Sequence, residues 1–236
     1  MARFFVEKSI IADNSVTIKG EDAHHISRVL RMREGDKITI CDCEGMDYYC
    51  IIETIAKSEV VVQVVSSEVN QTEPTVDIML FQGIPKQGKM EVIIQKAVEM
   101  GVRSIIPVVT HRCVAKGDKP ERWKKVVLEA AKQCGRGRIP EVCEAVSFNE
   151  AVKRMAGMEC KIMPYELETE GRLKDVLGSA REVGILIGPE GGFEEYEAEA
   201  ARAAGIKTVT LGKRILRTET AASAVIPIIL YTMGEM

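Results

Sequence analysis

Two stretches of the sequence predict how this chain folds: residues 184–193, GILIGPEGGF, and residues 209–221, VTLGKRILRTETA. Each stretch is a short apolar run that ends in a glycine-containing turn and is followed by a helix-like pattern. Ligands of α/β sheets bind outside the carboxyl ends of the strands, so two such turns close together would form one pocket. Either turn alone is equally well explained as an ordinary connection between a strand and a helix.

The first turn narrows the chemistry of the ligand. Gly188, Gly191 and Gly192 permit positive φ angles and let the backbone approach a bound molecule closely. Four glutamates in residues 194–199 suit a helix N-terminus but would repel a phosphate group. The chain contains neither GxxxxGK followed by Ser or Thr nor GxGxxG, the usual phosphate-binding motifs. We therefore expect a neutral or cationic ligand rather than a nucleoside triphosphate.

Together, GPEGG (188–192) and, about twenty residues later, LGKRILRTETA (211–221) resemble the cofactor-binding signature of the SPOUT methyltransferases. Within that superfamily the chain is most similar to the 16S rRNA uridine-N3 methyltransferases of the RsmE type. The similarity covers most of the chain. It includes HHISRVLR (24–31), KQGKMEVIIQKAVEMGV (86–102) and EAAKQCGRGRIPEV (129–142).

The pattern of elements divides the chain in two. Residues 1–70 contain short strand-like runs between turn signals, with one helix at about 22–32, which indicates a compact barrel. Residues 68–75 are polar and contain a proline, as expected of a linker. Strand-like and helix-like segments then alternate over residues 75–236, which predicts an α/β fold with a parallel sheet and helices on both faces.

The resemblance implies more than this pattern shows. It implies that residues 1–70 form a PUA-like RNA-binding barrel and that residues 75–236 form a SPOUT methyltransferase domain. It also implies a C-terminal trefoil knot in which the segments from about 163 to 220 are threaded. Periodicity carries no information about threading, and knots are rare among folds in general.

Composition excludes some classes of protein. No apolar run approaches the length of about eighteen residues that a membrane span requires, and charge appears too early for a signal peptide. The expected location is the cytoplasm. Seven cysteines occur without any CxxC pair, so we expect reduced thiols and no metal site.

Charge is unevenly distributed, although the net charge is only −3. Residues 81–140 carry 13 Lys and Arg against 5 Asp and Glu, whereas residues 1–70 carry 8 against 12. A concentrated basic segment is typical of a protein with an anionic partner, and a solvated helix face is the alternative. In the helix at about 22–32, Arg28 and Arg31 are three residues apart and would share one face. Eight residues are assigned to RNA contact: His25, Arg28, Arg31, Lys86, Lys89, Arg112, Arg136 and Arg138.

The resemblance implies that the cofactor is S-adenosylmethionine (SAM), whose cationic sulfonium agrees with the acid-rich first turn. The two glycine turns would form two walls of its site. A third loop, which closes the strand before the first turn, would pack on the cofactor. Carried over by position, the cofactor contacts are Met163, Pro164, Gly188, Pro189, Glu190, Gly191, Gly192, Leu211, Gly212, Ile215, Leu216 and Arg217.

Methyl transfer to N3 of uridine, the reaction implied, makes two chemical demands. The methyl group must be aligned with the nitrogen, and the N3 proton must be removed or the developing anion stabilised. Arg217 is the first candidate for holding the base or its anion. Glu219 and Glu190 are candidates for the proton acceptor, with water as the alternative. Arg3 is a candidate for reaching the substrate from the first domain.

Two other functions remain open at this point. One is a SPOUT methyltransferase that acts on tRNA or on a ribose 2′-hydroxyl, and the other is a non-catalytic ribosome assembly factor. The intact turns argue against the second. The expected partners are 16S rRNA, within the small ribosomal subunit, and a second copy of the chain in a homodimer. The final helix, 221–230, is apolar on nearly every side, which fits a subunit interface and a monomer core equally well.

Overall fold

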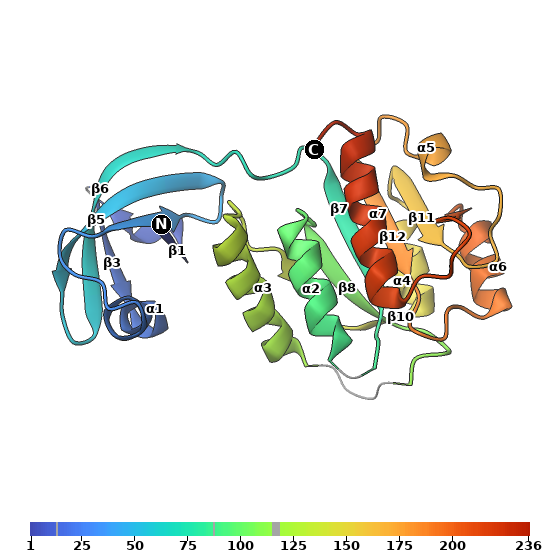
Figure 1. The fold of residues 1–236 in the computed structure, drawn as a ribbon, viewed down its shortest axis with the longest axis horizontal. Coiled ribbons are helices and arrows are strands. Elements are labelled where there is room, and N and C mark those ends of the chain that lie inside the picture. The colour runs from blue at the N-terminus through green and yellow to red at the C-terminus, as the bar shows by residue number, and fades with distance from the viewer. Residues whose placement is uncertain (13, 87, 115–118) are drawn as a thin grey trace. The chain divides into compact units, whose positions relative to one another are not determined.

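Two units make up the chain in the computed structural model, which describes residues 1–12, 14–86, 88–114 and 119–236 (Figure 1). The first unit consists of Met1–Glu73 together with Ala131–Ile139, and the second of Pro74–Ala130 together with Pro140–Met236. The sequence predicts that Asp118 caps a helix that begins near Pro120, and Asp118 lies outside the described residues. Among the residues described, no helix is both long and apolar enough to cross a membrane.

The first unit is a six-stranded sheet, in the order β1-β4-β5-β6-β3-β2, that packs around a single apolar cluster. Among the strand pairs that the structure describes in this unit, β1–β4 alone is parallel. Alternating residues such as Val16 and Ile18, or Ile38 and Ile40, point into this cluster, as the period of two predicts. The strands are β1 (Ala2–Phe5), β2 (Ile11–Ala12), β3 (Ser15–Lys19), β4 (Lys37–Cys41), β5 (Met46–Ile55) and β6 (Glu59–Val69).

The helix expected at about 22–32 is shorter and irregular. It begins as α1 (Gly20–His24) and continues as the π-helical turn η2 (His25–Val29), which the bond from Leu30 N to His25 O closes at 2.9 Å. Arg31 follows the helix with a φ of 52°, in the left-handed region. The prediction that Arg28 and Arg31 share a helical face is therefore wrong, because a π turn places residues differently and the helix ends between them.

The second unit is a parallel sheet in the order β10-β8-β7-β12-β11-β13, and β9 pairs with β8. The prediction of alternating strands and helices around a parallel sheet is confirmed. The strands are β7 (Asp77–Gly83), β8 (Ser104–Val109), β9 (Glu141–Val142), β10 (Val146–Ser147), β11 (Cys160–Pro164), β12 (Glu182–Ile187) and β13 (Lys207–Val209). The helices are α2 (Lys89–Glu99), α3 (Pro120–Cys134), α4 (Phe148–Met155), α5 (Leu173–Val176), α6 (Glu195–Ala203) and α7 (Thr218–Thr232).

Helices cover both faces of this sheet. α2 and α7 pack side by side against one face (Figure 1). α4 and α6 contribute Phe148 and Ala198 to a buried cluster that includes Phe81 and Leu186 from the other face. Because β12 and β13 both run parallel to β11, the turns that follow them lie at the same carboxyl edge of the sheet. The knot over about 163–220 stays a prediction.

The second domain was expected to run unbroken from residue 75 to 236, but Ala131–Ile139 belong to the first unit. Both carboxylate oxygens of Glu73 accept hydrogen bonds from Arg136, from Nε and Nη2, each at 2.8 Å. The backbone N–H groups of Gly137 and Arg138 also donate to Glu73. Asn70 Nδ2 donates to the carbonyl oxygen of Gly135 at 3.2 Å. These polar contacts, 63 to 65 residues apart in sequence, hold the end of α3 and the following loop in the first unit.

Candidate active site

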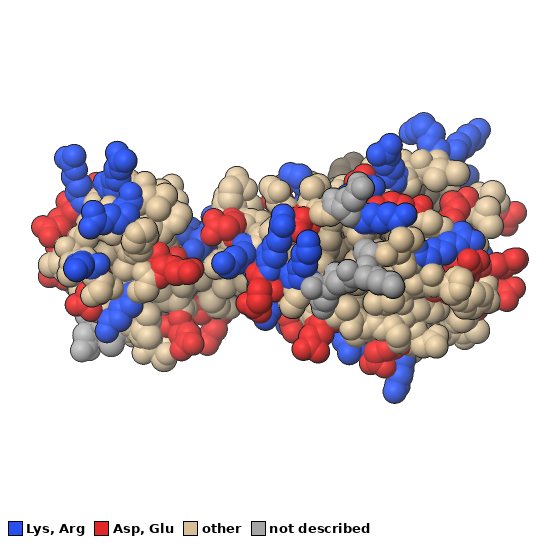
Figure 2. Space-filling model, turned by 90° about the horizontal axis from the view of Figure 1, so that it is seen from below, with Lys and Arg blue, Asp and Glu red and all other residues tan. Residues whose placement is uncertain are grey.

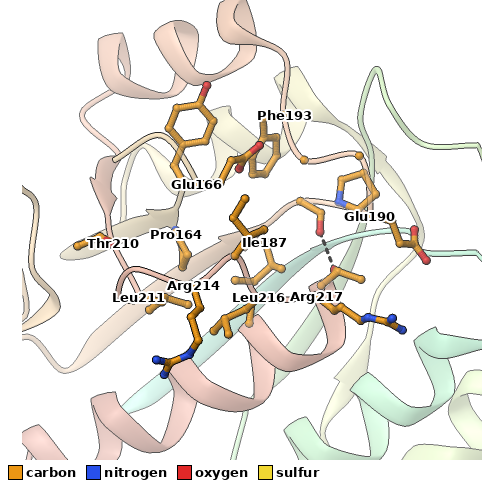
Figure 3. A pocket seen from close by; sticks show the side chains of 18 of the residues that line it. Pro164, Glu166, Ile187, Glu190, Phe193, Thr210, Leu211, Arg214, Leu216 and Arg217 are labelled. Carbon is orange, nitrogen blue, oxygen red and sulfur yellow. Dashed lines mark hydrogen bonds between the residues drawn. The ribbon is translucent and has the colours of Figure 1, made fainter. Parts of the chain in front are cut away.

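The two glycine turns and the end of β11 enclose a cavity of about 510 Å³ at the carboxyl edge of the parallel sheet (Figure 3). Its three walls come from residues 164–166, 187–193 and 210–218. In Figure 3, Pro164, Ile187, Leu211 and Leu216 surround the cavity. Apolar side chains and polar groups therefore line the site together, which suits a small molecule that has both kinds of surface.

Glycine is required at two points of the first wall. Gly192 has a φ of 68°, and a Cβ there would lie 2.4 Å from Glu166 Oε1. A Cβ at Gly188 would lie 3.1 Å from the ring of Phe193 and 3.2 Å from Gly192 Cα. These close approaches let the turn fold tightly over the end of β12 and present its backbone to the cavity.

The second wall is a loop that runs from β13 to α7. Gly212, with a φ of 107°, donates its N–H to Thr210 Oγ1 at 3.1 Å and turns the chain over the cavity. Ile215 is 84% exposed although it is apolar. In Figure 3 the guanidinium groups of Arg214 and Arg217 point to opposite sides, with Arg217 on the side of Glu190. The loop thus offers apolar surface and two cations at the mouth of the cavity.

The third wall follows β11. Tyr165 N donates to the carbonyl oxygen of Val209 at 3.0 Å. This bond ties the third wall to β13, the strand that precedes the second wall. Glu168 holds the rest of the loop, because its carboxylate accepts from Thr208 Oγ1 at 2.5 Å and from the N–H groups of residues 169–171. These bonds lower the pKa of Glu168 to about 2, with the bond from Thr208 contributing most.

A cluster of three charged side chains, Lys89, Glu190 and Glu219, lies at one edge of the cavity. Lys89 Nζ is 3.1 Å from Glu190 Oε1 and 3.4 Å from Glu219 Oε2. Partial burial works to raise the pKa of Glu190, but hydrogen bonds from backbone N–H groups and from Lys89 lower it overall. The pKa of Lys89 is raised, chiefly by its hydrogen bond to Glu190. One cation therefore joins α2, the first turn and α7.

Arg112, in the loop after β8, braces the first turn from outside. Its guanidinium donates to Glu194 through Nε and Nη2, at 2.9 and 2.8 Å, and to the carbonyl oxygen of Gly191 at 2.8 Å. The pKa of Glu194 is lowered, chiefly by this hydrogen bonding to Arg112. These contacts give Arg112, which was expected to bind RNA, a place in the construction of the cavity.

The predicted cofactor contacts lie together, with one exception. All of them except Met163 line the cavity. Met163 is fully buried in the cluster beneath α4 and α6, because alternate residues of β11 point to opposite faces of the sheet. Tyr165, which the resemblance also implies for the third loop, lines the cavity as well. Further lining residues were missed as cofactor contacts: Lys89, Glu166, Ile187, Phe193, Thr210, Lys213, Arg214, Thr218 and Ala221.

Two predicted contact residues are engaged elsewhere. Arg136 is only 4% exposed and is paired with Glu73, so its guanidinium is not part of an RNA-facing surface. Arg3 donates to both carboxylate oxygens of Asp47 at 2.6 Å and to the carbonyl oxygen of Arg136 at 3.2 Å. Both arginines thus hold the first unit together, and the expectation of a substrate contact for Arg3 has no support in this geometry.

The basic segment 81–140 does not form an unbroken positive surface in the view of Figure 2, where Lys and Arg alternate with Asp and Glu over α2 and α3. Ion pairs account for this mixture, including Arg122 with Glu91 at 2.8 Å and Lys96 with Glu99 at 2.7 Å. Arg28, Arg31 and Arg138 are exposed, as an RNA contact requires.

Comparison with known proteins identifies relatives over the whole chain. Residues 71–230 match the model of an RNA methyltransferase domain, and residues 18–65 match that of an RNA methyltransferase PUA domain. The ribosomal RNA small subunit methyltransferase E of Bacillus subtilis is 34% identical, over 98% of this chain and 96% of its own. That of Synechocystis is 31% identical, over 93% of this chain and 74% of its own.

A solved structure has the same fold. The ribosomal RNA small subunit methyltransferase E of Neisseria gonorrhoeae, crystallised with S-adenosylmethionine, superposes with a TM-score of 0.90 at 31% identity. The match covers 98% of this chain and 97% of that one. The expected fold class, a SPOUT-type parallel sheet preceded by a small PUA-like domain, is thereby confirmed. With its two family domains, its site and its near-complete match to these proteins, the chain belongs to the RNA methyltransferase family of the ribosomal RNA small subunit methyltransferases E.

Proposed function

We propose that this protein binds S-adenosylmethionine in the cavity between the two glycine turns and methylates N3 of a uridine in 16S rRNA. The observation that supports this most strongly is the cavity itself. It is built from the two motifs that carry the family resemblance, and the relative from Neisseria gonorrhoeae was solved with this cofactor. The apolar walls and backbone groups suit adenine and methionine, and the nearby carboxylates suit a sulfonium.

In this proposal Arg217 holds the uracil or its anion, because it lies at the mouth of the cavity on the side of Glu190 (Figure 3). The lowered pKa of Glu190 makes it a weak base. Glu219 is the other candidate for the proton acceptor. Its Oε2 is buried and has no well-formed hydrogen bond to any described residue, although Lys89 Nζ lies at ion-pair distance.

The proposed substrate is rRNA within the small subunit, bound in part by the first unit. The exposed guanidinium groups of Arg28 and Arg31 support this, because phosphate contacts position RNA without reading its sequence. Replacing both by alanine should weaken RNA binding and flatten its salt dependence by about two phosphate contacts. An unchanged slope would remove these residues from the interface.

We also infer that the protein is a cytoplasmic homodimer. α7 exposes Ile228 and, at 75%, Tyr231, and the neighbouring α2 exposes Val92. Exposed apolar side chains on two helices that pack side by side support pairing with a second copy. Sedimentation equilibrium of wild type and of Tyr231→Glu tests it: the variant should be monomeric, and a monomeric wild type would refute the dimer.

The decisive experiment incubates the protein with methyl-labelled SAM and small subunits, or naked 16S rRNA, from a strain that lacks the modification. Label recovered in 3-methyluridine would establish the reaction. Label in another nucleoside would keep the cofactor but exclude this substrate. The Arg217→Ala variant should still bind SAM but transfer methyl groups at least tenfold more slowly, since only the developing charge loses its partner.

A further inference from the structure

Gln82 is a fully buried polar side chain at the end of β7. It has no part in the proposed methyl transfer. It pairs in register with Ile187, the last residue of β12, whose side chain lines the cavity. Gln82 itself does not line the cavity. Buried amides normally satisfy all their hydrogen-bonding groups, so the partners of this one are informative.

The amide takes part in a relay to the cavity wall. Gln82 Nε2 donates to Thr218 Oγ1 at 2.8 Å and to the carbonyl oxygen of Gly83 at 2.9 Å. The hydroxyl of Thr218 in turn donates to the carbonyl oxygen of Gly188 at 2.6 Å. Thr218 is the first residue of α7, and Gly188 opens the first turn. Two hydrogen bonds thus connect three segments. Two of these segments are walls of the cavity, and Figure 3 marks the hydrogen bond between these two walls with a dashed line.

The direction of this relay is determined by the number of protons available. A hydroxyl has one proton, and the proton of Thr218 goes to Gly188. Thr218 Oγ1 can therefore only accept from Gln82, so the amide nitrogen must face it. Turning the amide over would place two acceptors against each other.

This orientation leaves Gln82 Oε1 buried and without a hydrogen-bond partner among the described residues. An unpaired buried acceptor costs free energy. Methionine has a similar volume and would fill the same space without an unpaired Oε1, but Thr218 Oγ1 and the carbonyl oxygen of Gly83 would each lose a donor. Packing alone therefore does not explain a glutamine here, whereas a requirement for its N–H groups does.

We propose that Gln82 is a positioning residue for the cofactor cavity. By donating to Thr218, its amide directs the hydroxyl of Thr218 onto Gly188 and so sets the spacing between the first turn and the start of α7. The proposal rests on the proposed function in one respect, that the ligand of the cavity is SAM.

The Gln82→Met variant separates this role from a structural one. It should bind SAM about tenfold more weakly, as expected for the loss of one neutral hydrogen bond. Its melting temperature should change little, because removal of the unpaired Oε1 offsets the loss of the hydrogen bonds to Thr218 and Gly83. A merely structural glutamine predicts the opposite pattern, with a lower melting temperature and unchanged affinity.

The Gln82→Glu variant tests the direction of the hydrogen bond. An ionised carboxylate can only accept, so it would draw the proton of Thr218 away from Gly188, whereas a protonated carboxyl can still donate. Its SAM affinity relative to wild type should therefore fall as pH rises through the pKa of the new carboxyl, which burial raises. Expressing affinity as this ratio cancels the charged groups that line the cavity in both proteins: Lys89, Glu166, Glu190, Lys213, Arg214 and Arg217.

Calorimetric titration of SAM into wild type, Gln82→Met, Thr218→Val and the double variant gives the decision. The two single losses should be similar and their combination no larger than either, because both break one relay. Thr110→Val is the matched control. It removes the hydroxyl of a residue as buried as Thr218 (4% against 5% exposed) but outside the cavity, and it should leave the affinity for SAM unchanged.

Wild type that fails to bind SAM would overturn the proposed function and this inference with it. Wild type and Gln82→Met that bind SAM equally well would overturn the inference alone.

Discussion

Gly83 lies against the first turn so closely that its missing side chain becomes a functional requirement. A Cβ on Gly83 would lie 2.7 Å from both the N and the Cδ atoms of Pro189, which are parts of a rigid ring and backbone. Gly83→Ala should therefore displace the turn, destabilise the protein by about 1–3 kcal/mol and weaken SAM binding more than tenfold. Calorimetric titration and urea unfolding measure the two effects.

Gly157→Ala provides the control for this substitution. A Cβ at Gly157 would meet nothing within 4 Å, and its φ is not positive. It should leave both quantities unchanged. If Gly83→Ala behaved like this control, the first turn would have to be more adaptable than its contacts indicate.

Glu168 should make the stability of the protein depend on pH. Its pKa is lowered to about 2 in the folded protein, so it contributes stability above its ordinary pKa of 4.5, and this contribution is lost as pH falls toward 2. Glu168→Gln should unfold at lower urea concentration than wild type at pH 7, and the difference should shrink between pH 4.5 and 2. A constant difference across this range would mean that the charge of Glu168 does not matter.

The residues of the site were predictable only in part, for a physical reason. GPEGG and LGKRILRTETA are contiguous, so their glycines and apolar residues could be assigned to a pocket from local pattern. Met163 and Pro164, which are adjacent in β11, could not be distinguished in this way, because a period of two separates the faces of a strand without saying which face meets the ligand. Gln82 lies some hundred residues from the turn that it helps to position.

At the scale of elements, the strands and helices with strong periodicity were predicted well. The sequence pattern predicts strands at 104–109 and about 160–164 and a last helix that begins near Thr218, and β8, β11 and α7 agree with these predictions. The helix at about 22–32 was predicted without its π turn, since apolar spacing hardly distinguishes a π turn from an α-helical one. The pattern also predicts one strand over about 141–146, where the chain instead forms two short strands, β9 and β10, that both pair with β8.

Lys89 joins three elements, and its replacement tests whether that junction matters. Lys89→Met leaves Glu190 and Glu219 without their shared cation, so their mutual repulsion should lower the melting temperature, more strongly at low salt. The pKa of Glu190 should rise. Thermal unfolding at two ionic strengths measures the loss in melting temperature. The double variant Lys89→Met, Glu219→Gln should recover most of this loss.

Lys96→Met is the matched control on the same helix. Lys96 pairs only with Glu99 within α2 and is about half exposed at its side chain. Surface pairs of this kind contribute little. An equal loss in both variants would show that the helix, and not the junction at the cavity, responds to the missing lysine.

At the scale of the whole molecule, the sequence pattern did not reveal that Ala131–Ile139 belong to the first unit. The pairing of Glu73 with Arg136 links positions that no local period connects. Glu73→Ala leaves the buried guanidinium without this carboxylate and should destabilise the first unit by about 3 kcal/mol. Hydrogen exchange should show faster exchange in β1–β6 and unchanged exchange in β7 and β8.

Glu44→Ala is the comparison for this prediction. It breaks the exposed pair with Lys8 in the same unit, where both side chains are more than half exposed. Exchange in β1–β6 should not change measurably. Faster exchange throughout the second unit in Glu73→Ala would instead mean that the two units unfold together.

The return of the chain to its first unit has a consequence for biosynthesis. Translation delivers residues 1–73 well before residues 131–139, which complete that unit. At roughly 5–20 residues per second, the nascent strands wait on the order of 3–13 s for their missing piece. During this interval Asn70 and Glu73 await Gly135 and Arg136, which are still unmade. The first unit therefore cannot finish folding until Pro74–Ala130, which belong to the second unit, have also been synthesised.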